Sequence, residues 1–233
     1  MENVQTEIAE MISNPSWQDE RSIPIISNDE FNTFLRNHLK DSTLSDLQCK
    51  QMKKQLVNSG FLLDFRKLVV LKPQWLADTF KSVISTKYEN DNGILSLNQV
   101  VDRLGLNEEI CKKLIWIWEK ELNTFVSHPK LENKFIIPSL LPEKRPKDLE
   151  NEWKGSMNKR DCIGRVYTVP FIPIGVFEGI FVRCSGISPM IGFWRNGFLL
   201  CKDEGSFLHL EMVTNNNSHI HSSKYIVTIH ATG

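Results

Sequence analysis

The chain has 233 residues, and its hydrophobic content of 41% and charged content of 24% are typical of a globular protein with one large domain or two small ones. The 28 basic and 28 acidic side chains balance, so the net charge gives no overall attraction to nucleic acid or to a membrane surface. No apolar run approaches the roughly 20 residues of a membrane span, and the polar residues 1–22 exclude a secretory signal peptide.

The five cysteines are widely spaced and odd in number, and no two of them form a C-x-x-C pair. This pattern argues against a disulfide framework and fits a reducing, cytoplasmic location. Catalytic signatures are also missing, because the sequence has no P-loop, no kinase catalytic-loop set and no G-x-S-x-G elbow. We therefore expect no catalytic residue, no metal and no cofactor within the chain, which predicts that it is not an enzyme by itself. An enzyme with an unfamiliar kind of site stays open as a further hypothesis, for which the sequence offers no candidate residues.

The first predicted elements are helical. Residues 1–26 predict a short helix and a linker. Ser27 and Glu30 then have the spacing of a capping box, which predicts the start of a helix. The apolar residues that follow are spaced as one helical stripe, and they are Phe31, Phe34, Leu35 and Leu39.

A second helix is predicted over Ser45–Asn58, with Leu47, Met52 and Leu56 facing inward, and Gly60 suits its left-handed C-terminal position. Two short strands are expected next, Phe61–Phe65 and Leu68–Leu71. Pro73 favours the first turn of a further helix, which carries Trp75 into the core.

The same order of elements is predicted again further along. The expected elements are a turn at 91–93, a strand at Ile94–Leu97, helices at Asn98–Leu104 and Asn107–Leu122, and a hairpin of Phe125–His128 and Lys134–Ile137. Helix, helix and hairpin therefore occur twice within residues 27–138. We predict an α+β fold whose first part, residues 27–142, is helical and winged-helix-like with small antiparallel strands.

The composition changes at Pro142, where we place a domain boundary. Residues 143–160 are rich in basic side chains and predict a solvated linker. Residues 161–233 predict a mainly antiparallel β part, in which Asn196 and Gly197 favour a type I′ hairpin turn. The expected strands are Val166–Ile172, Phe177–Arg183, Gly192–Trp194, Phe198–Cys201, Ser206–Val213 and Lys224–His230.

Four phrases of this sequence, in this order, carry a resemblance to a known family. They are Gly60–Phe65, Leu68–Asp78, Phe135–Pro142 and Phe193–Gly197. Together they resemble the COR domain, which follows the Ras-like Roc GTPase domain in Roco proteins. The resemblance covers roughly residues 27 to 230, and it implies a COR-A-like part at 27–142 and a partial COR-B-like part at 161–233, so that the chain would be a fragment ending inside the second subdomain.

The resemblance implies a non-catalytic regulatory and dimerisation module that packs on the adjacent Roc domain and couples its GTP/GDP cycle to conformational change. GTP and Mg²⁺ are expected in that adjacent domain, and the parent protein is expected to be a GTPase and often a serine/threonine kinase. The partners implied are the Roc domain and a second copy of the chain. The residues we select as a possible domain interface are Gln74, Trp75, Trp116, Trp194 and Arg195.

Three other interpretations compete with this one. The predicted helix 45–58 carries lysine and glutamine side chains suited to a DNA groove, so a winged-helix nucleic-acid-binding protein is the alternative, although zero net charge argues against it. The four histidines His209, His219, His221 and His230 invite a metal hypothesis, but surface histidines are the simpler interpretation. An arginine finger at Arg195 has only one residue to support it.

Overall fold

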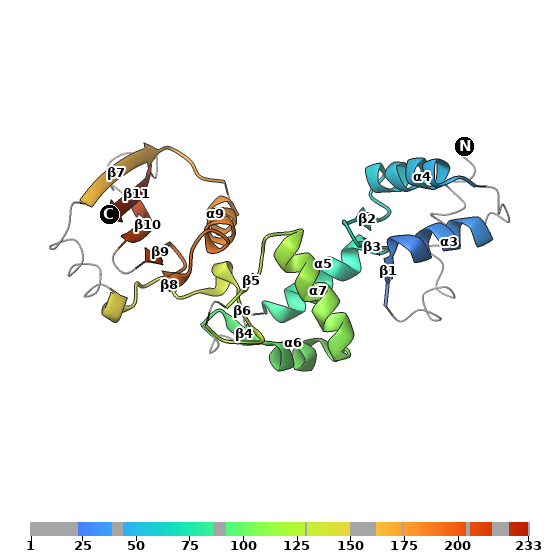
Figure 1. Cartoon of the computed structure of the whole chain (residues 1–233), viewed down its shortest axis with the longest axis horizontal. Coiled ribbons are helices and arrows are strands. Elements are labelled where there is room, and N and C mark those ends of the chain that lie inside the picture. Colours follow the sequence, from blue (N-terminus) through green and yellow to red (C-terminus); the bar gives the residue numbers. More distant parts are fainter. Residues whose placement is uncertain are drawn as a thin grey trace. The chain divides into compact units, whose positions relative to one another are not determined.

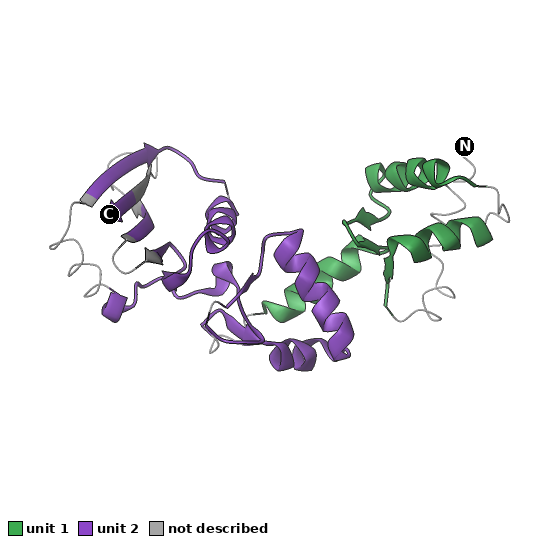
Figure 2. Ribbon diagram, viewed as in Figure 1, with its two compact units in different colours: residues 1–85 green, residues 86–233 purple. Residues whose placement is uncertain are grey.

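The computed structural model describes residues 23–38, 44–85, 92–128, 130–149, 162–173, 175–203, 206–215 and 224–232. The chain divides into two compact units, residues 1–85 and 86–233 (Figure 2). Helix pairs with small antiparallel sheets occur in both units, and a five-stranded antiparallel sheet ends the second (Figure 1). The predicted α+β class is therefore confirmed.

In its described residues, the first unit has two helices against a small sheet, followed by a third helix. Its elements are β1 (Ile25–Ser27), α3 (Asn28–His38), α4 (Asp46–Asn58), β2 (Leu63–Asp64), β3 (Leu68–Val70) and α5 (Pro73–Val83). The strands are antiparallel in the order β1-β3-β2. The predicted linker 1–26 falls mostly outside the described residues, but its end forms β1, a strand that the sequence analysis did not predict.

Local signals in the sequence account for the boundaries of these helices. The predicted capping box forms, because the backbone N–H of Glu30 donates to Ser27 Oγ and the carboxylate of Glu30 accepts from the N–H of Ser27. At α4 the side chain of Ser45 caps the helix in the same way with Gln48. Gly60 follows α4 with φ of 75°, the left-handed conformation that glycine adopts without strain.

The core of the first unit lies between α3, α4 and the sheet, where Phe31, Leu35, Cys49 and Leu56 are buried. Leu47 was predicted to face inward, but it is exposed. The helix turns 100° per residue, so the face that carries Cys49 and Leu56 leaves Leu47 on the opposite side. Trp75 is also not a core residue, because it is half-buried on α5.

The second unit begins with the same order of elements. These are β4 (Ile94–Ser96), α6 (Leu97–Leu104), α7 (Glu108–Lys120), β5 (Val126–Ser127) and β6 (Lys134–Ile136), with strand order β4-β6-β5. The predicted repetition of helix, helix and hairpin is confirmed, while the winged-helix character stays a prediction. Trp118 is buried on α7, and Leu122, the predicted last residue of this helix, lies beyond its end and is exposed.

In the described residues, a five-stranded antiparallel sheet with helix α9 on one face follows in the second unit, and residues 147–149 are also helical. The elements are a 3₁₀ turn η2 (Pro138–Leu140), β7 (Cys162–Val169), α9 (Val176–Ser185), β8 (Met190–Trp194), β9 (Gly197–Asp203), β10 (Ser206–Asn215) and β11 (Lys224–Thr232). The strand order is β7-β11-β10-β9-β8. Helix α9 packs on one face of this sheet, with Phe177 and Phe181 buried against Phe198 and Leu210.

The prediction of a strand at Phe177–Arg183 is wrong, because these residues belong to α9. Phe177 and Phe181 are four residues apart and both are buried, which is the spacing of one helical face. The apolar residues around them at 176, 180 and 182 hid this spacing in the sequence.

The predicted type I′ turn at Asn196–Gly197 is also wrong. Trp194 pairs directly with Gly197, so the two turn residues are Arg195 and Asn196. Among the described residues other than glycine, positive φ occurs only at Asn92, Asn123 and Asn133. A type I′ turn requires positive φ at both central residues, so the strand register has selected a different turn.

The boundary predicted at residue 142 does not coincide with the division between the compact units, which falls between Ser85 and Thr86. Val126, Ile136 and Leu141 share one core with Phe181 of α9 and Phe198 of β9. The change in composition at Pro142 therefore marks a change in local pattern and no break in packing. The division into COR-type subdomains stays a prediction.

Candidate functional site

Two of the predicted interface residues, Gln74 and Trp75, lie on the first turn of α5. Gln74 is exposed, and its side-chain amide donates a hydrogen bond of 3.0 Å to Asp78 Oδ1 one turn later. Trp75 is half-buried. Part of its ring therefore reaches solvent, which is a property shared by aromatic residues at protein interfaces.

Trp116 lies on α7 between the buried residues Ile115 and Ile117 and is itself half-buried. Residues two apart on a helix lie on different faces, so Trp116 does not share the face on which Trp118 is buried. The remaining two predicted residues, Trp194 and Arg195, are neighbours on the β8–β9 hairpin. The five residues are thus divided between the two units, two in the first and three in the second.

Arg195 holds the segment that leads into the sheet. Its backbone N–H donates to the carbonyl of Pro142 at 2.8 Å, and its Nε donates to the carbonyl of Leu141 at 3.0 Å. Its Nη1 forms an ion pair of 2.7 Å with Glu143. We name residues 141–149 the strap. The guanidinium of Arg195 binds the start of the strap, which argues against its acting as an arginine finger.

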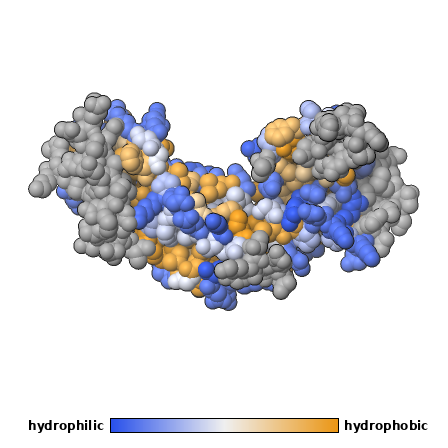
Figure 3. Space-filling view, turned by 180° about the vertical axis from the view of Figure 1, so that it is seen from behind, coloured by the Kyte–Doolittle hydropathy of each residue, from blue (hydrophilic) through white to orange (hydrophobic). Residues whose placement is uncertain are grey.

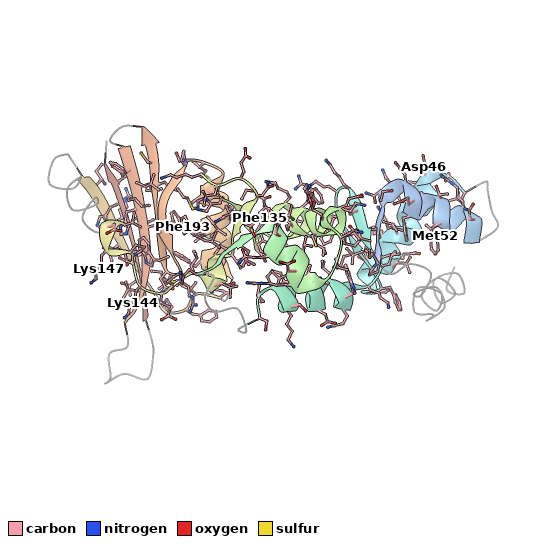
Figure 4. All side chains as sticks on the ribbon, turned by 90° about the horizontal axis from the view of Figure 1, so that it is seen from below. Asp46, Met52, Phe135, Lys144, Lys147 and Phe193 are labelled. Carbon is pink, nitrogen blue, oxygen red and sulfur yellow. The ribbon has the colours of Figure 1, made fainter. Side chains whose placement is uncertain are left out.

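The strap also places a second arginine, Arg145, against the sheet. Arg145 forms an ion pair with Glu211 of β10 and lies over the ring of Trp194, with its Cζ 5.0 Å from the ring centroid. Trp194 is only 2% exposed and stacks on His209 at 5.7 Å between ring centroids. Lys144 and Lys147 flank Arg145, are exposed, and lie beside the sheet in Figure 4.

The β register explains why these side chains meet. Gly164, His230, His209, Leu199 and Gly192 are paired in turn across all five strands, so they form one row on one face of the sheet. The glycines at the two ends leave room for larger groups. A Cβ on Gly164 would lie 2.6 Å from the imidazole of His230, and one on Gly192 would lie 2.1 Å from the side chain of Leu149 in the strap.

The opposite face of the sheet carries the core with α9. Phe193, which precedes Trp194 and is labelled in Figure 4, lies on that face. Its ring contacts Phe181 at 6.1 Å and His128 at 5.9 Å between ring centroids. Successive residues of a strand point to opposite faces. The β8 strand therefore joins the helix-covered core on one side to the strap on the other.

The hydrogen bonds of His209 determine its tautomer. Nη2 of Arg145 lies 3.3 Å from His209 Nε2, and a guanidinium can only donate, so Nε2 accepts. The proton of the neutral ring then lies on Nδ1, which is 3.5 Å from Nδ1 of His230. The two imidazoles are nearly parallel, with an interplanar angle of 4°.

The surroundings of His209 favour the neutral ring. The side chain is 4% exposed. Burial first, and then the positive charge of Arg145 and the neighbouring His230, lower the pKa of His209 from 6.5 to about 4. At neutral pH this histidine is therefore uncharged, and it serves as a hydrogen-bond acceptor for Arg145.

Sequence reasoning missed this cluster. His209 was interpreted as a surface histidine and Arg145 as part of a solvated linker, and both interpretations are wrong. The signal that could have found His209 is the alternation of β10, in which residues 207, 209 and 211 share one face. The signal for Arg145 was not local, because its partner Glu211 is 66 residues away. His219 and His221 lie outside the described residues.

The helix predicted to read DNA, α4, has part of its polar surface engaged within the first unit. Lys53 Nζ contacts Asn28 Oδ1 at 2.6 Å and Asp64 Oδ1 at 2.8 Å. Gln48 is used in the capping box of Ser45. Lys50, Gln51 and Lys54 remain exposed, which leaves few groups of this helix for phosphate contacts.

Several kinds of site are not present in the part of the chain that the structure describes. No three His, Cys, Asp or Glu side chains converge on a point that could hold a metal ion. Burial raises the pKa of the Cys111 and Cys184 thiols, which disfavours a reactive thiolate. Among the same residues, no helix combines the length and the apolar character needed to cross a membrane.

Comparison with known proteins gives similarity to protein kinases of Dictyostelium discoideum. The chain is 29% identical over 211 residues, or 81% of its length, to the probable serine/threonine-protein kinase roco11. It is 31% identical over 63% of its length to the probable serine/threonine-protein kinase pats1, and 30% identical over 70% of its length to the probable serine/threonine-protein kinase qkgA. No protein-family model matches the chain.

The similar region is a small part of each relative. It spans 14% of roco11, 5% of pats1 and 12% of qkgA. Over much of its length the chain is thus related to a region of Roco-family serine/threonine kinases. The predicted relation to Roco proteins is confirmed at this level, and the assignment to the COR domain stays a prediction.

Proposed function

We propose that this chain is a COR-type regulatory module of a Roco protein, which packs on an adjacent Roc GTPase domain and couples its GTP/GDP cycle to signalling in the cytoplasm. The observation that carries the proposal is the similarity to Roco-family kinases over 81% of the chain. GTP and Mg²⁺ would bind in the Roc domain, and a kinase domain in the same protein would receive the signal.

The proposal assigns contact with the Roc domain to the half-exposed aromatic residues. Trp75 with its neighbour Gln74, and Trp116, present polar and aromatic surface to solvent. Trp194 and Arg195 have a different role in this proposal, because one is buried and the other is bound to the strap. They would position the sheet and make no direct contact with the GTPase.

Coupling requires that the module binds the two nucleotide states with different affinity, since equal binding shifts no equilibrium. Calorimetric titration of the chain with the Roc domain, loaded with GDP or with a GTP analogue, tests this. Different affinities are expected. Equal affinities would contradict coupling, and absence of binding in both states would contradict the whole proposal.

A pair of variants on α5 tests the assigned surface. We expect Trp75→Ala to weaken binding to the Roc domain by about tenfold or more, as buried aromatic anchors do. Lys81→Ala, on an exposed position of the same helix, is the matched control and should leave the affinity unchanged. Equal effects of the two variants would argue against Trp75 as a contact.

Self-association is the second part of the proposal, and the edge strand β7 supports it. Large hydrophobic side chains reach the surface in several places, and Figure 3 shows hydrophobic residues among hydrophilic ones on one face of the molecule. On β7, Ile163 is 72% exposed, and Val166 and Tyr167 are exposed as well. The strand lies at an edge of its sheet, where unpaired backbone groups can accept a further strand.

Sedimentation velocity of the full chain tests this surface. Val166→Lys should shift the chain toward monomer, because the lysine places a charge on the strand that would be paired. Val213→Lys, on the exposed surface of β10, is the matched control and should have no effect. Dimerisation that survives Val166→Lys would place the contact elsewhere.

A further inference from the structure

The strap is attached to the sheet at three points. Arg195 binds its start at Leu141 and Glu143, Arg145 reaches Trp194, His209 and Glu211 near its middle, and Leu149 at its end fills the space above Gly192. Trp194 and Leu199 are buried on this face, and together with Arg145, Leu149 and His209 they line one small hollow.

The middle attachment depends on a neutral His209. Nε2 of this ring accepts from Arg145 at 3.3 Å, and a proton on Nε2 would remove the acceptor and place two cations side by side. Among the described residues, Arg145 from the strap and His230 from β11 lie beside His209, and Glu211, which shares its face of β10, pairs with Arg145. Trp194 from β8 and Leu199 from β9 are neutral.

We propose that the strap is a proton-sensitive latch: protonation of His209 releases residues 144–149 from the sheet, while residues 141–143 stay bound to Arg195, and exposes the surface around Trp194 and Leu199. The inference does not depend on the proposed relation to a GTPase domain. Release would turn a closed face of the sheet into an aromatic and apolar surface, and it would loosen the connection between the sheet and the residues that precede it.

The direction of the pH dependence follows from proton linkage. With the strap released, His209 is in solvent and its pKa returns toward 6.5, whereas with the strap bound its pKa is about 4. The released state therefore binds more protons between these values. The strap is therefore most strongly attached above about pH 6.5. Between about pH 6.5 and 4, each unit of acidification shifts the equilibrium between attached and released strap toward release by up to about tenfold.

Acrylamide quenching of Trp194 fluorescence in the full chain measures the release. Because the chain has six tryptophans, the fluorescence of Trp194 is obtained by subtracting the signal of the Trp194→Phe variant from that of the wild type. We expect quenching to increase as the pH falls from 7.5 toward 4.5, with an unchanged far-ultraviolet circular dichroism spectrum. Loss of the β signal together with the increase would mean that acid unfolds the sheet, which would overturn the latch.

Three variants identify the group that responds. His209→Gln keeps an oxygen that accepts from Arg145 but does not titrate, so the pH dependence should disappear. His128→Gln, at a histidine that contacts Phe193 and not the strap, should leave it unchanged. A transition that persists in His209→Gln and disappears in Glu211→Gln would overturn the proposal, because the carboxylate would then be the switch.

A fourth variant is needed in case the strap is attached so strongly that the wild type shows no release above pH 4.5. Leu149→Ala removes the side chain that packs on Gly192, so the attachment weakens and the transition moves to higher pH. If neither the wild type nor Leu149→Ala shows a transition above pH 4.5, His209 does not control the strap and the proposal is wrong.

Discussion

Neighbouring lysines on α4 show how much the setting of a single charge matters. The side chain of Lys53 is 13% exposed and bridges Asn28 and Asp64, which lie on α3 and β2. Lys54, the next residue, is exposed. The same residue type thus contributes to tertiary structure at one position and to the solvated surface at the next.

We expect Lys53→Met to lower the free energy of unfolding by about 1–3 kcal/mol, because it leaves two polar oxygens without their shared donor. Lys54→Met is the matched control and should change it by less than about 0.5 kcal/mol. Urea unfolding followed by circular dichroism measures both. Equal effects of the two variants would show that the Lys53 network adds nothing to stability.

Gly197 is a position where the absence of a side chain is required by a neighbour. A Cβ there would lie 2.1 Å from Cζ2 of Trp194 and 2.8 Å from the backbone oxygen of Leu210. Trp194 is buried and contacts both Arg145 and His209, so it has little room to move.

Gly197→Ala should therefore destabilise the protein by about 1–3 kcal/mol through overpacking and alter the fluorescence of Trp194. Gly179→Ala provides the control within the same unit. Gly179 lies inside α9 with no atom within 4 Å of an added Cβ, so alanine should stabilise the helix by about 0.5–1 kcal/mol. Thermal unfolding measures both changes, and destabilisation by both would contradict the packing argument.

At the level of the elements, the ends of helices could be predicted where the sequence has capping residues. Helix ends lie where the sequence predicted them at Ser27 with Glu30, at Ser45, at Asn107 and at Gly60. The failures occurred where the local pattern was ambiguous. The α9 helix reads as a strand because apolar residues surround its buried face, and the β8–β9 turn depends on a register that only the whole sheet determines.

The helical nature of α9 has a measurable consequence at two adjacent residues. Phe181 is buried and contacts Phe193 and Phe198, whereas Ile180 is at the surface. Phe181→Ala should cost about 3–5 kcal/mol through the cavity it leaves, and Ile180→Ala less than about 1 kcal/mol. Urea unfolding measures the difference. Similar costs would show that α9 does not pack on the sheet as described.

At the scale of the whole molecule, the sequence predicted the class of fold and the relation to Roco proteins but not the packing of residues 141–149. A composition change suggested a linker there, although Arg145 finds its partner Glu211 far along the chain. The cluster of Trp194, His209 and Arg145 follows from the register of five strands. Sequence periodicity predicts which residues of one strand share a face, but it does not predict which residues of neighbouring strands are paired.

The net charge of the whole chain argues against the alternative that the protein binds nucleic acid. The 28 basic and 28 acidic side chains balance, and the lysine at the centre of the α4 network is already paired with Asp64. Since phosphate contacts supply most non-specific affinity for DNA, the chain has little with which to bind a duplex.

We therefore expect the dissociation constant for a short fluorescent duplex to be weaker than about 10⁻⁴ M at physiological salt, the weak end of non-specific binding. Fluorescence anisotropy measures it. A double variant, Lys50→Glu with Lys54→Glu, reverses the charge of the exposed face of α4 and should leave this weak binding unchanged. Micromolar binding that falls steeply with salt, and that the double variant abolishes, would instead establish α4 as a DNA-reading helix, because only direct phosphate contacts produce both effects.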